Sequence, residues 1–203
     1  GTFERYWTEF VQRRDGQGAW KDYTPYEWRN VAAFVRLGWR ERAWEAVDFF
    51  FKDRAPQAWN QWAEVVSRTP RTPFFVGDLP HAWVASDFVR SALDMFAYSR
   101  ERDDSIVLAA GVPVAWLDGE GIALDGLRTP SGILAYSLRR AGNEVLLEAK
   151  TGLALPAGGL VLPWPYEGAP GETRVNGEPA QWKDGELRIG TLPARVSVRI
   201  EQP

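Results

Sequence analysis

The chain has 203 residues, a net charge of −3, one histidine and no cysteine. The lack of cysteine excludes disulfides, thiolate metal centres, iron–sulfur clusters and a cysteine nucleophile, and the single histidine, His81, excludes multi-histidine metal sites. The slight negative charge argues against a nucleic-acid partner, which needs a clustered basic face, and the apolar runs are too short for a membrane-spanning helix.

The first hundred residues have the apolar spacing of helices. Thr24 followed by Pro25 suits a helix N-terminus, and Gly38 suits the C-terminal cap of the same helix. The expected helices cover residues 3–11, 25–38, 40–52, 56–66 and 80–96. A loop is expected around Pro70, Pro73 and Gly77. About five helices with short connections favour antiparallel hairpins.

After residue 103 the apolar period changes to two, which is typical of strands. The clearest strand patterns cover residues 106–110, 133–138, 144–149 and 195–200. Turn signals recur at Asp118-Gly119, Asp125-Gly126, Asn176-Gly177 and Asp184-Gly185. About eight short strands with such turns favour an antiparallel β-sandwich. The sequence therefore predicts an α+β chain in two parts, helical hairpins over residues 1–103 and a sandwich over residues 104–203.

Tryptophan is the outlier of the composition, with 11 residues. The helical part contains most of them: Trp7, Trp20, Trp28, Trp39, Trp44, Trp59, Trp62 and Trp83. The segment 39–51 has bulky apolar residues on more than one helical face, and such a helix must be covered on more than one side. We therefore expect these helices to pack against a missing partner or to belong to a larger closed array.

Two motifs carry a resemblance to a known superfamily. Trp59-Asn-Gln-Trp-Ala-Glu64 precedes a proline-rich loop, and Gly77-Asp-Leu-Pro-His-Ala-Trp83 then opens a long helix before the sandwich. This order resembles the C-terminal end of a six-hairpin glycoside hydrolase of the glucoamylase-like superfamily. Ala63-Glu64 fits a late barrel motif, and Leu79–Trp83 fits the motif that starts the last helix, with looser spacing and with Pro80 and His81 inserted.

The resemblance implies a partial (α/α)6 barrel around a sugar-binding cavity, followed by an accessory sandwich. The tail residues Arg174-Val-Asn-Gly-Glu-Pro and Leu192-Pro-Ala-Arg-Val are similar to such sandwich modules. About half the barrel and the general acid would then lie on the remainder of a parent polypeptide. The partners implied are a carbohydrate and that remainder, in an extracellular or periplasmic bacterial protein. The chain begins Gly1-Thr2 without a signal segment, so we expect any signal peptide upstream.

The catalytic candidates are Glu64 and Asp78. Glycoside hydrolysis needs two carboxyl groups, and by the resemblance Glu64 would be the general base of an inverting mechanism. Glu64 is expected late in a tryptophan-rich helix, where it can equally be an ordinary surface glutamate near a helix end. Asp78, beside Gly77, can point into a cavity or serve as a turn or N-cap aspartate. We expect neither a cofactor nor a bound metal.

The substrate-binding candidates surround these carboxylates. They are Trp59, Trp62, His81, Trp83 and Asp87. The indole rings offer flat faces to sugars or simply pack the core, and because Trp59 and Trp62 are three residues apart, one of them is expected in the core. His81 binds sugar or is a structural histidine, and Asp87 contacts a sugar hydroxyl or pairs with an arginine such as Arg90. The aromatic segment 18–27 lines a cavity or caps the helix that follows.

Three functions follow from these features. The first is a fragment of a glycoside hydrolase that is inactive by itself because the acid partner is absent. The second is a non-catalytic carbohydrate-binding or scaffolding module of a larger secreted protein. The third is a self-contained α+β domain that dimerises through its aromatic helices.

Overall fold

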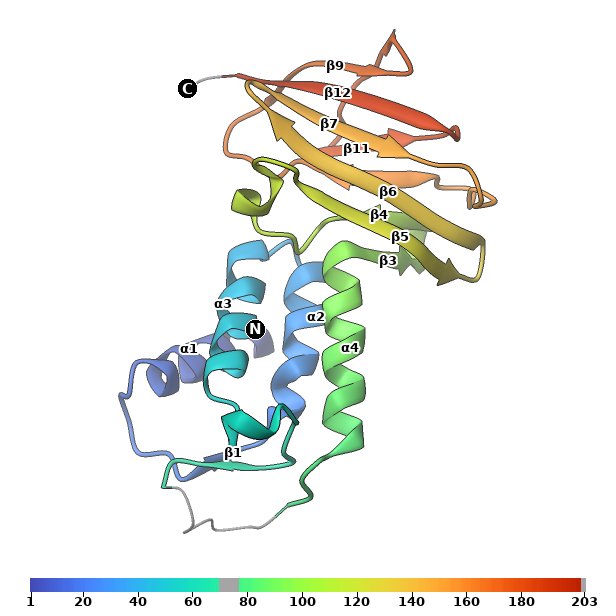
Figure 1. Ribbon diagram of the computed structural model, residues 1–203. Helices are drawn as coiled ribbons and strands as arrows, with labels where there is room; N and C mark the ends of the chain where they lie inside the picture. Colours follow the sequence, from blue (N-terminus) through green and yellow to red (C-terminus); the bar gives the residue numbers. More distant parts are fainter. Residues whose placement is uncertain (70–76, 202–203) are drawn as a thin grey trace. The chain divides into compact units, whose positions relative to one another are not determined.

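The computed structural model describes residues 1–69 and 77–201, and the chain forms two compact units, Gly1–Leu93 and Asp94–Pro203. The predicted boundary after residue 103 falls at the end of a short 3-10 helix in the second unit. Pro70 and Pro73, around which a loop is expected, lie outside the described residues. A helical part followed by a part built of sheets is thus present (Figure 1).

The first unit is helical. Its elements are α1 (Thr2–Arg14), β1 (Asp22–Tyr23), η1 (Pro25–Glu27), α2 (Trp28–Arg36), α3 (Arg40–Lys52), η2 (Gln57–Trp59), β2 (Val66–Ser67) and α4 (Ala82–Phe96), of which the last three residues belong to the second unit. Aromatic rings fill the space between the helices. Phe34 of α2 packs edge-on against Trp7 of α1, and Trp28 contacts Phe50 of α3 at 5.1 Å between ring centroids.

Local sequence signals explain both ends of α2. The Thr24 hydroxyl accepts the backbone N–H of Tyr26, and Pro25 opens a 3-10 turn that continues into the helix. At the other end Gly38 adopts a φ of 76°, which glycine tolerates best. The backbone N–H of Gly38 then bonds to the Val35 carbonyl, and that of Trp39 bonds to the Phe34 carbonyl. This double closure turns the chain sharply into α3.

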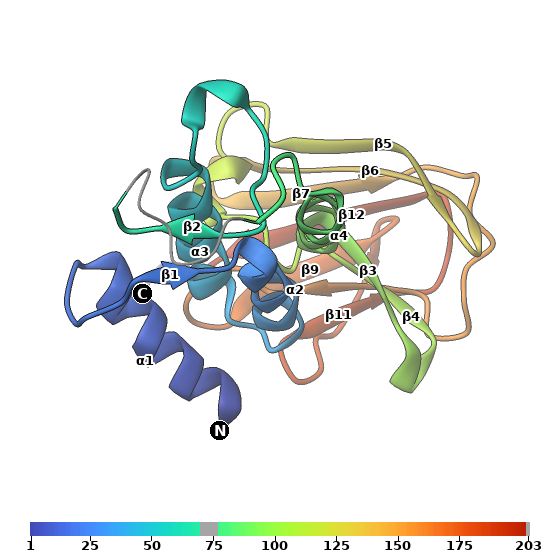
Figure 2. The same cartoon turned by 90° about the horizontal axis from the view of Figure 1, so that it is seen from below.

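The helix predicted over residues 56–66 does not form. Only one 3-10 turn, η2, follows Pro56, because Asn60 adopts a left-handed φ of 53° that ends it. Val66 then pairs with Tyr23 in the short β1–β2 ribbon, which suits the β-branched pair at residues 65–66 (Figure 2). The described residues therefore contain four α-helices rather than the expected five, and Glu64 lies at a bend outside any helix or strand.

The second unit consists of two sheets around one core. The larger sheet has the order β10 (Glu178–Pro179), β9 (Pro170–Val175), β12 (Ala194–Ile200), β7 (Glu144–Ala149), β6 (Gly132–Ala141), β5 (Ile122–Thr129). The smaller has the order β11 (Glu186–Ile189), β8 (Leu160–Pro163), β4 (Ser105–Leu108), β3 (Ala97–Arg100), with η3 (Glu101–Asp103) and η4 (Val114–Leu117) in the connections. Leu108 and Leu162 of the smaller sheet share a buried cluster with Leu138, Leu147 and Val198 of the larger.

Two details of the sheets differ from the sequence prediction. Strand β4 pairs with β8 in parallel, whereas the other strand pairs among the described residues are antiparallel. Asp125-Gly126 forms no turn, because it lies inside β5 where the pairing register with β6 shifts. By contrast, Asn176-Gly177 joins β9 to β10 with positive φ at both residues, as predicted for a tight hairpin.

Candidate functional site

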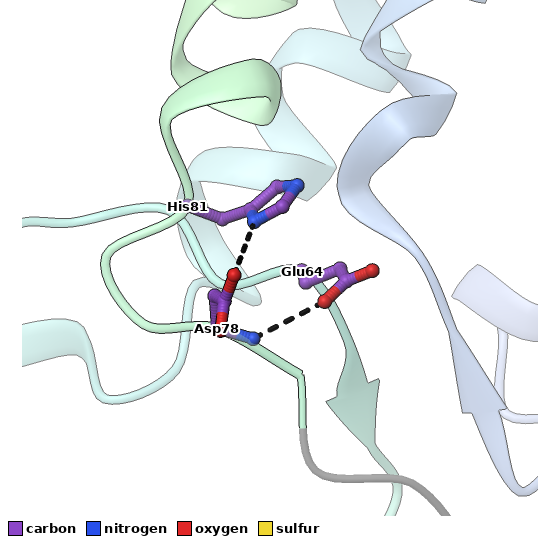
Figure 3. A group of neighbouring side chains, drawn as sticks. All are labelled: Glu64, Asp78 and His81. Atoms are coloured by element: carbon purple, nitrogen blue, oxygen red, sulfur yellow. Dashed lines mark hydrogen bonds and ion pairs between the residues drawn. The ribbon is translucent and has the colours of Figure 1, made fainter.

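The two motifs singled out in the sequence meet in the first unit. The backbone N–H of Glu64 donates to the Asp78 carbonyl at 3.0 Å, and the backbone N–H of Asp78 donates to Glu64 Oε2 at 3.2 Å (Figure 3). The Thr24 hydroxyl donates to the Glu64 carbonyl at 2.7 Å. Three hydrogen bonds therefore hold Glu64 in place, and not the helix predicted around it.

A glycine permits this close approach. A Cβ atom on Gly77 would lie 2.6 Å from Glu64 Cβ and 2.7 Å from Glu64 Oε2, closer than real Cβ atoms approach other atoms. The Glu64 carboxylate therefore lies directly against the backbone of residue 77 and beside the N–H of Asp78. The Gly-Asp step of the second motif has a steric reason, which the sequence alone did not reveal.

His81 lies at the start of α4 and faces the same carboxylates. Its backbone N–H donates to the Trp62 carbonyl at 2.7 Å. Its Nε2 lies 2.7 Å from the Tyr26 hydroxyl oxygen, and its Nδ1 lies 3.7 Å from Asp78 Oδ2. The His81 side chain is 12% exposed, whereas that of Asp78 is 82% exposed. The imidazole is thus held from behind by Tyr26 and directs its other nitrogen toward the carboxylates (Figure 3).

These three side chains form a compact cluster of ligand atoms. One carboxylate oxygen of Glu64, one of Asp78 and a ring nitrogen of His81 all lie within 4.8 Å of one another. Two carboxylates and an imidazole are donors that divalent cations such as Zn²⁺ and Mn²⁺ accept, so these are the residues that can hold a metal. The same three groups can share and transfer a proton, since carboxylates accept protons and an imidazole can donate or accept one.

Tyr26 completes the cluster and was not selected from the sequence, although the aromatic segment that contains it was. Burial, and secondly the Glu64 carboxylate, raise the pKa of the Tyr26 phenol, so the phenol stays protonated and can donate to His81 Nε2. The Arg29 guanidinium lies 4.6 Å from the centre of the Tyr26 ring. A cue for this role was the position of Tyr26 one step after the Thr24-Pro25 helix start.

The remaining substrate-binding candidates separate into exposed and buried residues. Trp83 is 70% exposed and its ring centre lies 6.4 Å from that of His81. Asp87 pairs with Arg29 at 2.7 Å, which confirms the expected arginine partner, although Arg90 was the example named from the sequence. Because the Trp83 ring is exposed beside the cluster, it can present an indole face to a ligand.

The tryptophans of the first motif do not share a face. Trp59 is 62% exposed, whereas Trp62 is 7% exposed and packs against Trp28 at 5.2 Å and Phe88 at 5.3 Å between ring centroids. The prediction that one of the two lies in the core is therefore confirmed, but because η2 ends at Trp59 the two rings do not share a helical face. Trp62 is a core residue of the first unit.

In the comparisons with known proteins, no family model, no curated protein and no solved structure matches the chain. Among the described residues, no helix combines the length and the apolarity needed to cross a bilayer.

Proposed function

We propose that the first unit carries part of the carbohydrate site of a six-hairpin glycoside hydrolase, with Glu64 as the general base. The observation that carries this proposal is the meeting of the two motifs, in which Glu64 and Asp78 bond to each other through backbone and carboxylate beside His81. A carboxylate that is fixed in place, half-buried and close to an exposed indole suits activation of a water molecule at a sugar.

The separation of the two carboxylates supports different roles for them. Inverting hydrolases place their two carboxyl groups about 6.5–9.5 Å apart to leave room for water, and retaining hydrolases about 5–5.5 Å apart. Oxygens of Glu64 and Asp78 approach within 4.8 Å. So close an approach favours a supporting role for Asp78 over that of the opposing acid in an inverting pair. In this proposal it holds Glu64 and contacts sugar or water, and the acid comes from the remainder of the parent polypeptide.

Exposed apolar side chains on α4 support the idea that the helical unit belongs to a larger array. Val89 and Leu93 are 51% and 39% exposed. Their spacing of four residues places them on one side of the helix. Further helices of an (α/α)6 barrel would cover this side.

The test is hydrolysis of a panel of para-nitrophenyl glycosides by the parent protein. Glu64→Gln should lower kcat by roughly 10²–10⁴, the usual contribution of a general base, with little change in KM. Glu45→Gln, which makes the same carboxylate-to-amide change on α3, should leave kcat unchanged. Equal kcat in the Glu64→Gln variant and the unmodified protein would overturn the assignment. Robust hydrolysis by the 203-residue chain alone would overturn the part that places the acid elsewhere.

The exposure of Trp59 and Trp83 favours a second candidate, a carbohydrate-binding module without catalysis. Both candidates predict that sugars quench indole fluorescence, so binding alone does not separate them. Hydrolysis does: a module binds the same sugars in the parent protein, and Glu64→Gln then changes no turnover.

A further inference from the structure

A groove runs between α2 and α4 in the first unit, and its volume is about 420 Å³. It is lined by Arg29, Ala32, Ala33, Arg36, Asp87, Arg90 and Ser91. The two helices lie side by side (Figure 1), and the rings of Trp28 and Phe88, with centroids 5.1 Å apart, pack between them.

Helical spacing explains how the sequence builds this groove. The α2 residues that line it recur at intervals of three and four, so they form one face, with arginines about 10.5 Å apart along the axis and alanines between them. The alanines leave the floor open because they fill little space. Ser91 of α4 is 1% exposed and donates to the Trp28 carbonyl at 2.8 Å, so it forms the α4 side of the groove base.

The charge of the groove is opposite in sign to that of the chain. Three guanidinium groups line it against one carboxylate, in a protein whose net charge is −3. The carboxylate, Asp87, already pairs with Arg29 at 2.7 Å. The side chain of Arg29 is 63% exposed, and Arg36 and Arg90 are exposed residues. An anion entering the groove therefore meets arginine side chains from both helices.

One end of the groove adjoins the candidate site. Arg29, which lines the groove, also covers the Tyr26 ring at 4.6 Å, and the Tyr26 hydroxyl contacts His81 at 2.7 Å. A ligand that occupies the Glu64–Asp78–His81 cluster can thus extend past Tyr26 to the arginines.

We propose that this groove is a subsite for an acidic sugar, a uronic acid unit of an oligosaccharide whose neighbouring unit lies at the Glu64–Asp78–His81 cluster. The planar guanidinium fork matches a carboxylate with two parallel hydrogen bonds, a geometry that a neutral hydroxymethyl group cannot reproduce. The open floor over the alanines receives the ring. This inference rests on the proposed carbohydrate function and adds the class of substrate.

The test compares acidic sugars with their neutral methyl esters, which keep the ring and remove the charge. Oligosaccharides of galacturonate and of glucuronate are titrated into the 203-residue chain by calorimetry at low salt. At least one acid should bind roughly tenfold more tightly than its ester, because charge-assisted hydrogen bonds are lost in the ester. The Arg36→Gln/Arg90→Gln double variant should lose this preference, and Arg5→Gln, an exposed arginine on α1, should keep it. Unchanged circular dichroism of the double variant excludes unfolding as the cause.

Each other outcome has a defined meaning. Equal affinity for acid and ester, or no binding of either acid, overturns the uronate subsite. If in that case the unmodified chain binds an ester and Trp83→Ala abolishes this binding, the carbohydrate site stands without the subsite. If acids bind through the arginines but Trp83→Ala and Glu64→Gln change nothing, the groove is an anion site and the carbohydrate function fails. Tighter binding of a poly-glutamate peptide than of both acids assigns the groove to a protein partner and overturns the sugar.

Discussion

Tyr26 and His81, 55 residues apart in the chain, join through a contact of 2.7 Å between the phenol oxygen and Nε2. This contact joins η1, the turn directly before α2, to the start of α4. It leaves His81 Nδ1 facing Asp78 and Glu64. The orientation of the imidazole is therefore set by a residue outside both motifs, as it is in sites where a second hydrogen bond fixes a histidine tautomer.

Replacing Tyr26 by phenylalanine should release the imidazole. Because His81 is the single histidine, its ring nitrogens give isolated signals in a nitrogen-15 spectrum. We expect the unmodified protein to show mainly the Nδ1–H tautomer and Tyr26→Phe to show a mixture. Tyr23→Phe removes a different phenol, bonded to Asp53 at 2.8 Å, and should leave the His81 signals in place. Identical spectra for all three proteins would contradict the positioning role of Tyr26.

Gly77→Ala should disrupt the meeting of the two motifs. The added methyl group collides with Glu64, so we expect a destabilisation of about 1–3 kcal/mol in the unfolding of the first unit, typical of overpacking. Gly190→Ala is the control, since a Cβ there has no neighbour within 4 Å. Calorimetric scans measure both. An unfolding temperature of Gly77→Ala equal to that of the unmodified protein would mean that the Glu64–Asp78 contact is not tightly packed.

The two tryptophans of the first motif should differ sharply in their contribution to stability. Trp62→Ala removes a ring that three aromatic residues surround, and should cost about 3–5 kcal/mol. Trp59→Ala truncates an exposed ring and should stay within about 0.5 kcal/mol. Urea unfolding of the two variants makes the comparison. Similar losses would favour a helix with both rings on its buried side.

Acid should weaken the second unit through Asp103. Hydrogen bonds from Arg100, and then from Arg188 and Ser105, hold the pKa of the Asp103 carboxyl well below its usual range. A carboxyl whose folded pKa is depressed stabilises the fold above its unfolded pKa of about 4, and this stability is lost as the pH falls toward the folded pKa. The stability difference between the unmodified protein and Asp103→Asn should therefore shrink below about pH 4. A difference that stays constant from neutral pH to pH 2 would contradict this account.

Local signals predicted much of the fold. Three local signals act through backbone conformation within a few residues, so the sequence alone reveals them. They are the Thr24-Pro25 helix start, Gly38 and the Asn176-Gly177 turn. The helix expected after Pro56 failed because aromatic spacing imitates a helical face, while the left-handed Asn60 breaks it. The parallel pairing of β4 with β8 was also missed, since a period of two is the same in parallel and antiparallel strands.

The candidate site was predicted in its residues but not in its geometry. Glu64, Asp78 and His81 all came from the motifs, and the fold brings them within 4.8 Å. Tyr26 and the requirement for Gly77 depend on contacts between segments 13 or more residues apart, which no local pattern encodes. The arginine groove depends on α2 and α4 lying together, and helical period alone did not predict that neighbour.

The most direct test of a carbohydrate site in this cluster is the nuclear magnetic resonance signal of His81 during titration of the chain with neutral and acidic oligosaccharides. The account predicts that at least one sugar shifts the His81 ring signals in a saturable manner, and that Trp83→Ala, which removes the exposed indole beside His81, weakens this response strongly. His81 signals that stay unmoved by every sugar up to millimolar concentrations would contradict it.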